Sequence, residues 1–302
     1  MQVSRIDLDG TGSPMGLVGK ILKAEPNLTI PVPIEELAHQ LDIAEIRELS
    51  ADGFEGGLIT DDARSSGIIL VNRAARRGRR RFTIGHELGH FLMTTHKPPA
   101  GGFQCSRADM RRWTGKEEGA AARMEVEANE FSGLILMPPP LWRKEMGKFR
   151  DPELSQIITL AGLFDVSKEA AARTYAQYHN EPVALVVVKD GTIDRIYRDI
   201  GRFPRLGVRP GTPVPVGSLL FRAAKQLDHP SIISEARAEI WLESDWGKPL
   251  PGLYEQVFFQ QNGFALIMLW AELVDEEESD GWEDKTSKQR LRERQAKWAD
   301  RR

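Results

Sequence analysis

One pentapeptide, His86-Glu87-Leu88-Gly89-His90, constrains this chain more than any other segment. It lies in a stretch whose apolar residues recur at helical spacing, and residues four apart in a helix lie almost directly above one another. His86 and His90 can therefore offer both imidazoles to one metal ion. Glu87 can stand beside that ion without binding it, and can take a proton from a water molecule activated there. The pattern is typical of zinc peptidases.

Two other interpretations would give the same five residues: a chance match, or two histidines that only fill a core. The helix has a separate apolar face, formed by Ile84, Leu88, Phe91 and Leu92, so the histidines are not needed for packing. A glutamate next to buried histidines would also be costly to bury. We therefore interpret the pentapeptide as a metal site.

A catalytic zinc site needs a third protein ligand and an open position for water. His96 has the spacing of the third histidine in one class of such sites, but that class requires glycine where this chain has Met93. Methionine favours a continued helix rather than a sharp turn. We therefore expect His96 to lie at the helix end, near the negative pole of the helix dipole.

Glu125 is the better candidate for the third ligand. Apolar residues recur at helical spacing through 124–135, which leaves Glu125 and Asn129 together on a neighbouring stripe. There Glu125 could bind the metal, and Asn129, one turn further on, could orient a histidine through a hydrogen bond. Solvation is the alternative for every glutamate of this helix. We favour solvation for Glu127 and Glu130, and spacing alone leaves it open for Glu125.

Longer segments around these two helices resemble the ImmA/IrrE-type metallopeptidase family. The resemblance extends over roughly residues 30–178, where the family usually has alanine in place of Gly85 and Ser132. The matching segments are Ile-Leu-Val-Asn at 69–72, Arg-Phe-Thr-Ile-Gly-His-Glu-Leu-Gly-His-Phe-Leu at 81–92, Glu-x-Glu-Ala-Asn-x-Phe-Ser at 125–132 and Leu-Met-Pro at 136–138.

Family members are gluzincin-like, with two histidines and a glutamate on Zn²⁺. The resemblance implies His86, His90 and Glu125 as zinc ligands, Glu87 as the catalytic residue and Asn129 as a supporting residue. Several members cleave a helix-turn-helix repressor in a stress or mobile-element response, so it implies limited proteolysis of such a protein partner. Two alternatives stay open: a general zinc peptidase, and a DNA-binding or regulatory protein with a vestigial metal site.

Composition limits the class of protein further. A chain of 302 residues suits two domains, and a net charge of −3 excludes a globally basic nucleic-acid binder. The single cysteine, Cys105, cannot form an internal disulfide and fits a reducing compartment. No stretch approaches the ~20 apolar residues of a membrane span, and the N-terminus has no apolar signal-peptide core. We expect a cytoplasmic protein without a membrane partner; the sequence leaves its oligomeric state open.

Two segments next to the predicted metal helices each allow a functional interpretation and a purely structural one. Six arginines between 73 and 81 could bind an acidic segment or nucleic acid, but we favour a solvated loop in which one arginine holds structure. Residues 97–117 are expected to form a long loop, as in lids and binding loops. Cys105 lies in it, and its thiolate could occupy the open zinc position. We favour a free bystander thiol.

The chain as a whole predicts an α+β fold. The metal domain should contain a helix at 33–41 and a small β-sheet with strands at 57–60 and 67–71. The five expected parts are a partly ordered lead-in (1–29), a gluzincin-like zinc metallopeptidase domain (30–150), a helix-turn-helix-like helical segment (151–180), a strand-rich C-terminal domain (181–272) and a charged tail (273–302).

The second half contains clear turn signals. Asp190-Gly191 and Asn262-Gly263 each stand between strand-like runs, which predicts two hairpins. We also expect a helix near 218–227. The helix pair around 164–167 offers few basic residues on its second helix, so packing is favoured over DNA contact.

Two further predictions concern the oxyanion partner and the tail. Tyr175, Tyr178 and His179 are candidates for the group that stabilises an oxyanion, and the residues give no reason to choose among them. The tail is acidic through 272–284 and basic through 285–302. We expect it to be helical or disordered and solvated; pairing of the basic run with the acidic run and weak nucleic-acid contact are both left open.

Overall fold

The structure is a computed structural model that describes residues 1–97, 103–106, 108–111, 119–244 and 249–272. It divides into two compact units, of which the first contains residues 1–147 and 160–170 and the second the remainder. The expected charged tail at 273–302 lies outside the described residues. No described helix has the length and hydropathy that a membrane crossing requires.

The first unit contains a four-stranded sheet in the order β1-β3-β2-β4. β1 and β3 are parallel and the other pairs are antiparallel, with Gly56 of β2 opposite Cys105 of β4. The predicted strands at 57–60 and 67–71 are confirmed. The strands are β1 (Ile43–Leu49), β2 (Phe54–Thr60), β3 (Gly67–Asn72) and β4 (Phe103–Ser106).

β1 and β4 were not predicted. β1 is exposed along most of its length, so its sequence lacks the alternation of apolar and polar residues that marks a half-buried strand. β4 shows that 97–117 is not one continuous loop. It is only four residues long and is followed by a short 3-10 turn, η1 (Asp109–Arg111).

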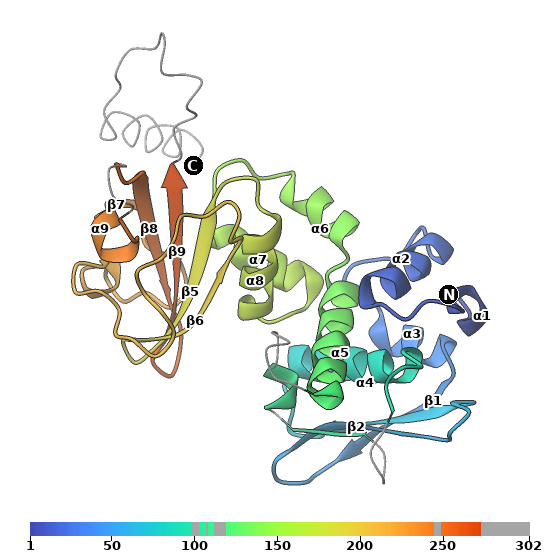
Figure 1. The fold of residues 1–302 in the computed structure, drawn as a ribbon. Helices are drawn as coiled ribbons and strands as arrows, with labels where there is room; N and C mark the ends of the chain where they lie inside the picture. The colour runs from blue at the N-terminus through green and yellow to red at the C-terminus, as the bar shows by residue number, and fades with distance from the viewer. Residues whose placement is uncertain (98–102, 107, 112–118, 245–248, 273–302) are drawn as a thin grey trace. The chain divides into compact units, whose positions relative to one another are not determined.

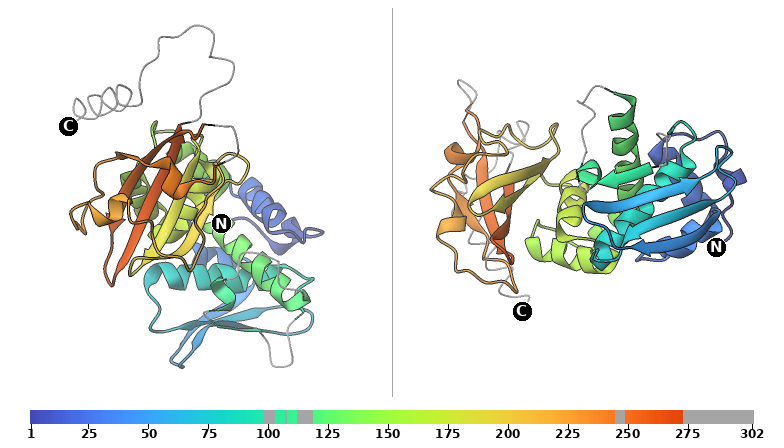
Figure 2. Two further views of the ribbon diagram at one scale, coloured as in Figure 1. Left: turned by 60° about the vertical axis from the view of Figure 1, so that its left-hand side comes forward. Right: turned by 90° about the horizontal axis from the view of Figure 1, so that it is seen from below.

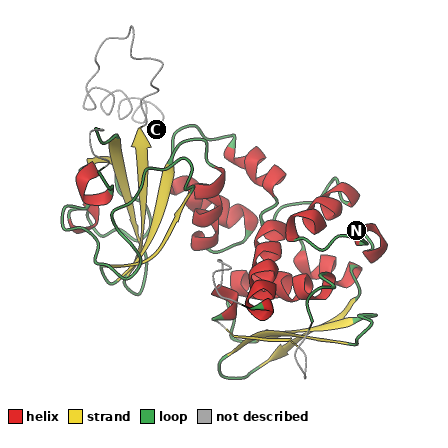
Figure 3. Cartoon of the chain, in the orientation of Figure 1, coloured by secondary structure: helices red, strands yellow, loops and turns green. Residues whose placement is uncertain are grey.

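The helices of this unit lie on one face of the sheet (Figures 1 and 3). α4 packs against β2 and β3, α5 packs along α4, and α2 packs against α5. The right-hand view of Figure 2 shows the strands of the same sheet side by side. The helices are α1 (Arg5–Leu8), α2 (Pro14–Ala24), α3 (Ile34–Gln40), α4 (Arg77–Leu92), α5 (Ala120–Leu136) and α6 (Pro139–Met146).

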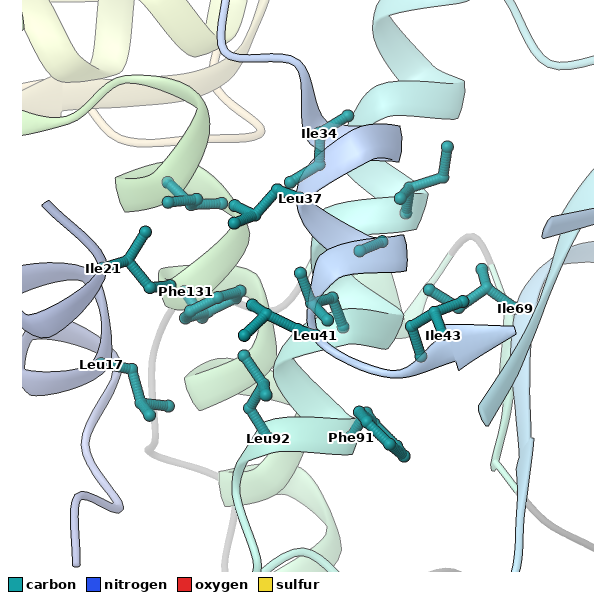
Figure 4. Packing of buried hydrophobic residues seen from close by; sticks show 14 of the residues in the cluster. Leu17, Ile21, Ile34, Leu37, Leu41, Ile43, Ile69, Phe91, Leu92 and Phe131 are labelled. Atoms are coloured by element: carbon teal, nitrogen blue, oxygen red, sulfur yellow. The ribbon is translucent and has the colours of Figure 1, made fainter. Parts of the chain in front are cut away.

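The N-terminal residues 1–29 are more than the partly ordered lead-in that we expected. α2 begins with a Ser13 cap, whose hydroxyl accepts a hydrogen bond from the Gly16 amide. Leu17 and Ile21 of α2 are fully buried and join Phe131 of α5 in the core (Figure 4). The many glycines of this segment obscured its helical spacing. The predicted helix at 33–41 is confirmed as α3.

Two helices, α7 (Leu154–Phe164) and α8 (Lys168–Tyr178), confirm the predicted helix pair. Asp165 between them adopts a positive φ of 53°, a conformation that asparagine and aspartate tolerate better than most residues. Ser167 caps α8, since its hydroxyl accepts a hydrogen bond from the Ala170 amide at 3.1 Å.

The second unit contains a five-stranded antiparallel sheet in the order β6-β5-β9-β8-β7 (Figure 2, left). β5, β8 and β9 are buried along most of their length, so both faces of the central strands are covered. The strands are β5 (Val183–Lys189), β6 (Thr192–Arg198), β7 (Ser234–Ala236), β8 (Gly252–Phe259) and β9 (Phe264–Glu272).

Both predicted hairpins are present. Asp190 and Gly191 have φ values of 48° and 77°, as the mirror-image turn of a two-residue hairpin requires. The second hairpin has a longer turn, because β8 ends at Phe259 while Asn262 and Gly263 carry the positive φ values.

The expected helix at 218–227 is wrong. The structure has only a 3-10 turn there, η2 (Leu219–Phe221), and a short helix α9 (Ala238–Trp241) further along. Leu219 is buried, but Phe221 and Leu227 are more than half exposed. The segment therefore has no continuous apolar face that a helix would bury.

Candidate metal centre

Small residues bring α4 and α5 unusually close together. A Cβ atom on Gly85 would lie 2.7 Å from the hydroxyl of Ser132, and one on Gly89 would lie 3.1 Å from the ring of Phe131. Ser132 also donates a hydrogen bond to the Phe82 carbonyl at 2.8 Å. This close packing places the predicted carboxylate ligand on α5 over the histidines of α4.

The structure brings His86, His90 and Glu125 together. The two Nε2 atoms lie 3.1 Å apart, and carboxylate oxygens of Glu125 lie 3.2 Å from His86 Nε2 and 3.4 Å from His90 Nε2. Both histidines are fully buried. Three donor atoms from two helices therefore face one point.

The hydrogen on His86 can be assigned from its neighbours. The Asn129 amide nitrogen donates to the Asp109 carbonyl at 2.9 Å, so the amide oxygen faces His86 Nδ1, 3.0 Å away. An amide oxygen only accepts, and Nδ1 must therefore carry the hydrogen. Nε2 of His86 is left with a lone pair directed at the cluster. Asn129 thus occupies the supporting position that we predicted.

A second chain of contacts fixes His90 in the same way. His96 Nε2 lies 2.8 Å from a carboxylate oxygen of Glu127, and His96 Nδ1 lies 2.9 Å from His90 Nδ1. Burial lowers the pKa of His96 and lowers that of His90 to about 3, so both rings are neutral. His96 then donates to Glu127 and accepts from His90, which leaves His90 Nε2 with a bare lone pair.

These contacts fit a bound cation. Two bare nitrogen lone pairs 3.1 Å apart beside a carboxylate repel one another unless a positive ion lies between them. In a tetrahedral zinc site with Zn–N bonds of about 2.0–2.1 Å, the two nitrogens would be about 3.3 Å apart. The donors present therefore suit Zn²⁺ in kind and spacing.

Glu87 lies beside this cluster as the spacing predicted. Its side chain is fully buried, and no nitrogen or oxygen donor contacts its carboxylate among the described residues, while the Cys105 thiol lies beside it and favours the charged form. Burial raises the pKa of Glu87 to about 7. A Cβ atom on Gly56 would lie 2.7 Å from Glu87 Oε1, so the carboxylate sits directly against β2.

Cys105 lies in the cluster, contrary to our expectation of a bystander thiol in a long loop. Its Sγ is 3.9 Å from His90 Nε2, and donor atoms of His86, His90, Cys105 and Glu125 all lie within 4.8 Å of one another. The side chain is 3% exposed. Burial, together with the nearby carboxylates of Glu87 and Glu125, raises the pKa of the thiol far above its usual range.

His96 was set aside as a metal ligand because Met93 stands where that class of site needs glycine, and no contact was predicted for it; in the structure its two ring nitrogens contact His90 and Glu127. Glu127 is not the solvated residue we expected, since it pairs with His96; Glu130 is exposed, as expected.

Arg64 was not among the predicted residues. Its guanidinium donates hydrogen bonds to the carbonyls of His90, Phe91, Met93 and His96, and so holds the end of α4. No sequence pattern marks that arginine.

The three oxyanion candidates belong to the second unit. The Tyr175 hydroxyl donates to Gln156 at 2.7 Å, and His179 Nδ1 accepts a hydrogen bond from the Glu181 amide at 3.0 Å. Tyr175 and His179 are therefore used within their own unit. The role of Tyr178 in stabilising an oxyanion stays a prediction.

The arginine run before α4 is used for structure. Arg79 pairs with Glu55, Arg80 with Glu35 and Glu48, and Arg77 and Arg81 with Asp165. Arg81 also donates to the Val32 carbonyl at 2.8 Å. The structure is closer to the structural interpretation of this run than to a binding patch. Several arginines, rather than the single one expected, form ion pairs with neighbouring elements.

A His-Glu-x-x-His helix and a carboxylate from a second helix, meeting beside a mixed sheet, define a candidate metallohydrolase centre in an α+β protein. Residues 39–175 match the family model described as the IrrE N-terminal-like domain. Over these residues the chain matches that peptidase family, the ImmA/IrrE family, which confirms the resemblance seen in the sequence; the ligand set stays a prediction.

Other comparisons show the fold only. A solved structure described as a Mycobacterium tuberculosis transcriptional regulator superposes with a TM-score of 0.51 at 13% identity, over 86% of this chain and 75% of that one. No curated protein sequence matches the chain.

Proposed function

We propose that this chain is a gluzincin-like, zinc-dependent endopeptidase that cuts a protein partner at a limited number of sites. The observation that carries the proposal is the meeting of the His86 and His90 Nε2 atoms, 3.1 Å apart, with the Glu125 carboxylate, beside the buried carboxylate of Glu87. The match to a peptidase family supports the same conclusion.

His86, His90 and Glu125 would hold the zinc ion. When bound, zinc would polarise the scissile carbonyl and lower the pKa of a water molecule to about 7. Glu87 would take a proton from that water and give it to the leaving amine. Burial raises the pKa of Glu87 to about 7 in the metal-free protein; a bound cation would lower it, so the carboxylate would be ionised at neutral pH and able to accept the proton.

The substrate that we propose is a helix-turn-helix transcriptional repressor in a stress or mobile-element response. The proposal rests on the family, several of whose members act on such proteins. A peptide that pairs with a sheet edge binds as extended backbone, so a folded substrate must offer a loop or open locally. β4 is an edge strand among those described, and its free edge suits pairing with such a segment.

A regulatory DNA-binding role is the second candidate, because the superposed M. tuberculosis protein is called a transcriptional regulator. The arginines nearest the site pair with Glu55, Glu35, Glu48 and Asp165, which argues against a free basic patch there. Sub-micromolar DNA affinity with a steep salt dependence, unaffected by a chelator, would support this role instead.

The test is incubation of the zinc-loaded protein with candidate helix-turn-helix proteins, those encoded by neighbouring genes first, followed by intact-mass analysis. The Glu87→Gln variant is the matched control, because it retains the ligands and loses the base. A single defined cut that disappears in the variant supports the proposal. Equal cleavage by both proteins contradicts the role of Glu87, and broad digestion of casein contradicts limited proteolysis.

A further inference from the structure

We propose that Cys105 is a fourth ligand of the same ion, so that the resting protein has a closed site without a position for water. This inference rests on the proposed function, because it concerns the ion held by His86, His90 and Glu125. It adds that the enzyme is latent until the Cys105 sulfur is withdrawn.

The spacing of the donor atoms supports four-coordination. With a Zn–S bond of about 2.3 Å and a Zn–N bond of about 2.0–2.1 Å, the sulfur and nitrogen of a tetrahedral site would be about 3.6 Å apart. Cys105 Sγ lies 3.9 Å from His90 Nε2 in the structure. Because all four donor atoms fall within 4.8 Å of one another, one ion can contact them all after small shifts.

The fold holds the thiol at the cluster. Cys105 lies opposite Gly56 in the β2–β4 register, and Gly56 has no side chain to separate the sheet from α4. A Cβ atom there would lie 2.4 Å from Thr83 and 2.7 Å from Glu87. The thiol and the buried Glu87 carboxylate therefore both stand on the side of the cluster that the sheet covers.

The number of protein ligands on the ion distinguishes a closed state of the site from an open one. Two imidazoles, a carboxylate and a thiolate satisfy zinc with four protein ligands, as in structural sites, whereas catalytic sites keep three and an open position. Binding of the Cys105 sulfur would release the thiol proton to solvent and exclude water from the ion, and its withdrawal would require the thiolate to take up a proton.

The fourth ligand is the one most easily removed. His86, His90 and Glu125 stand on helices of 16 and 17 residues that pack on each other. Cys105 stands on a four-residue edge strand that pairs only with β2 among the described strands. A shift of β4, such as an extended segment of the substrate pairing along its edge would produce, removes the sulfur and leaves three ligands in place.

Cobalt substitution tests the ligand directly. Co²⁺-loaded wild-type protein should show a thiolate-to-cobalt charge-transfer band in the near ultraviolet, and Cys105→Ser should lose it. The Glu87→Gln control should keep the band, because Glu87 is not a ligand. Zinc affinity of Cys105→Ser should fall at least about tenfold, given that even supporting residues of zinc sites contribute that much.

The outcomes separate this inference from the proposed function. Wild-type protein that binds no cobalt overturns both. Bound cobalt without the band overturns only the role of Cys105. With zinc saturating, Cys105→Ser should cleave an unstructured peptide severalfold faster than wild type. Equal or slower cleavage by zinc-loaded Cys105→Ser overturns the closed resting state.

Discussion

The Nδ1 atoms of His90 and His96 lie 2.9 Å apart, so a histidine outside the His-Glu-x-x-His pattern sets the tautomer of one inside it. The far nitrogen of His96 contacts Glu127 at 2.8 Å, and this carboxylate completes a chain of three groups. Partners of this kind orient metal-binding histidines and raise their basicity. The orientation of His90 therefore depends on two residues that lie outside the His-Glu-x-x-His pattern.

Replacing His96 by alanine should weaken zinc binding about 10- to 100-fold, because His90 loses the group that fixes its Nε2 lone pair. Competition with a chelating dye measures the zinc affinity. His229→Ala is the control, since that side chain is 58% exposed and pairs only locally with Asp228. Unchanged affinity in His96→Ala would show that the chain of contacts does not support the ligand.

Gly56→Ala should both destabilise the protein and reduce hydrolysis. The added methyl would meet Thr83, Glu87 and Met110 at 2.4, 2.7 and 3.0 Å. Overpacking of this kind costs about 1–3 kcal/mol, and here it also pushes the Glu87 carboxylate from its place. Chemical denaturation measures the free energy of unfolding, and peptide cleavage measures the activity.

Gly12→Ala provides the matched control for that substitution. Gly12 has open space where its Cβ would be, so its stability should stay within about 0.5 kcal/mol of wild type. A Gly56→Ala protein as stable and as active as Gly12→Ala would mean that α4 does not press on β2 as described.

Glu255 should make the second unit less stable as pH rises. Burial raises the pKa of this carboxyl above its usual value near 4.5, even though it accepts hydrogen bonds from Ser218 and the Leu219 amide. The folded state then holds a proton that the unfolded state has lost. The contribution of Glu255 is thus fully present below pH 4.5 and is lost as pH rises through its folded pKa.

The measurement is the unfolding free energy of wild type and Glu255→Gln between pH 4.5 and 7. Glutamine has no proton to lose, so the variant should lose less stability than wild type across this range. Parallel curves for the two proteins would show that burial of Glu255 does not favour its protonated form.

The part of the candidate site that lies on one helix could be proposed from the sequence, because a helix fixes the relation between residues four apart. His86, Glu87 and His90 needed only that geometry. Glu125 and Asn129 needed the family resemblance, since helical spacing alone could not separate Glu125 from the solvated Glu130.

Residues from other elements could not be predicted in this way. Cys105 reaches the cluster through the β2–β4 register, and Arg64 reaches the end of α4 from the turn between β2 and β3. Neither position follows from spacing along the chain, because each depends on how the sheet packs against α4. β1 and β4 were missed for a different reason, because their local sequence signals are weak: β1 is mostly exposed and β4 is only four residues long.

The zinc content of three purified proteins tests the central claim most directly. Elemental analysis of the wild type and of Glu87→Gln should give about one zinc per chain, because Glu87 stands beside the ion without holding it. Glu125→Ala should retain a small fraction of that after dialysis, since it loses the carboxylate that faces both Nε2 atoms. Full zinc content in Glu125→Ala would contradict the ligand set of His86, His90 and Glu125.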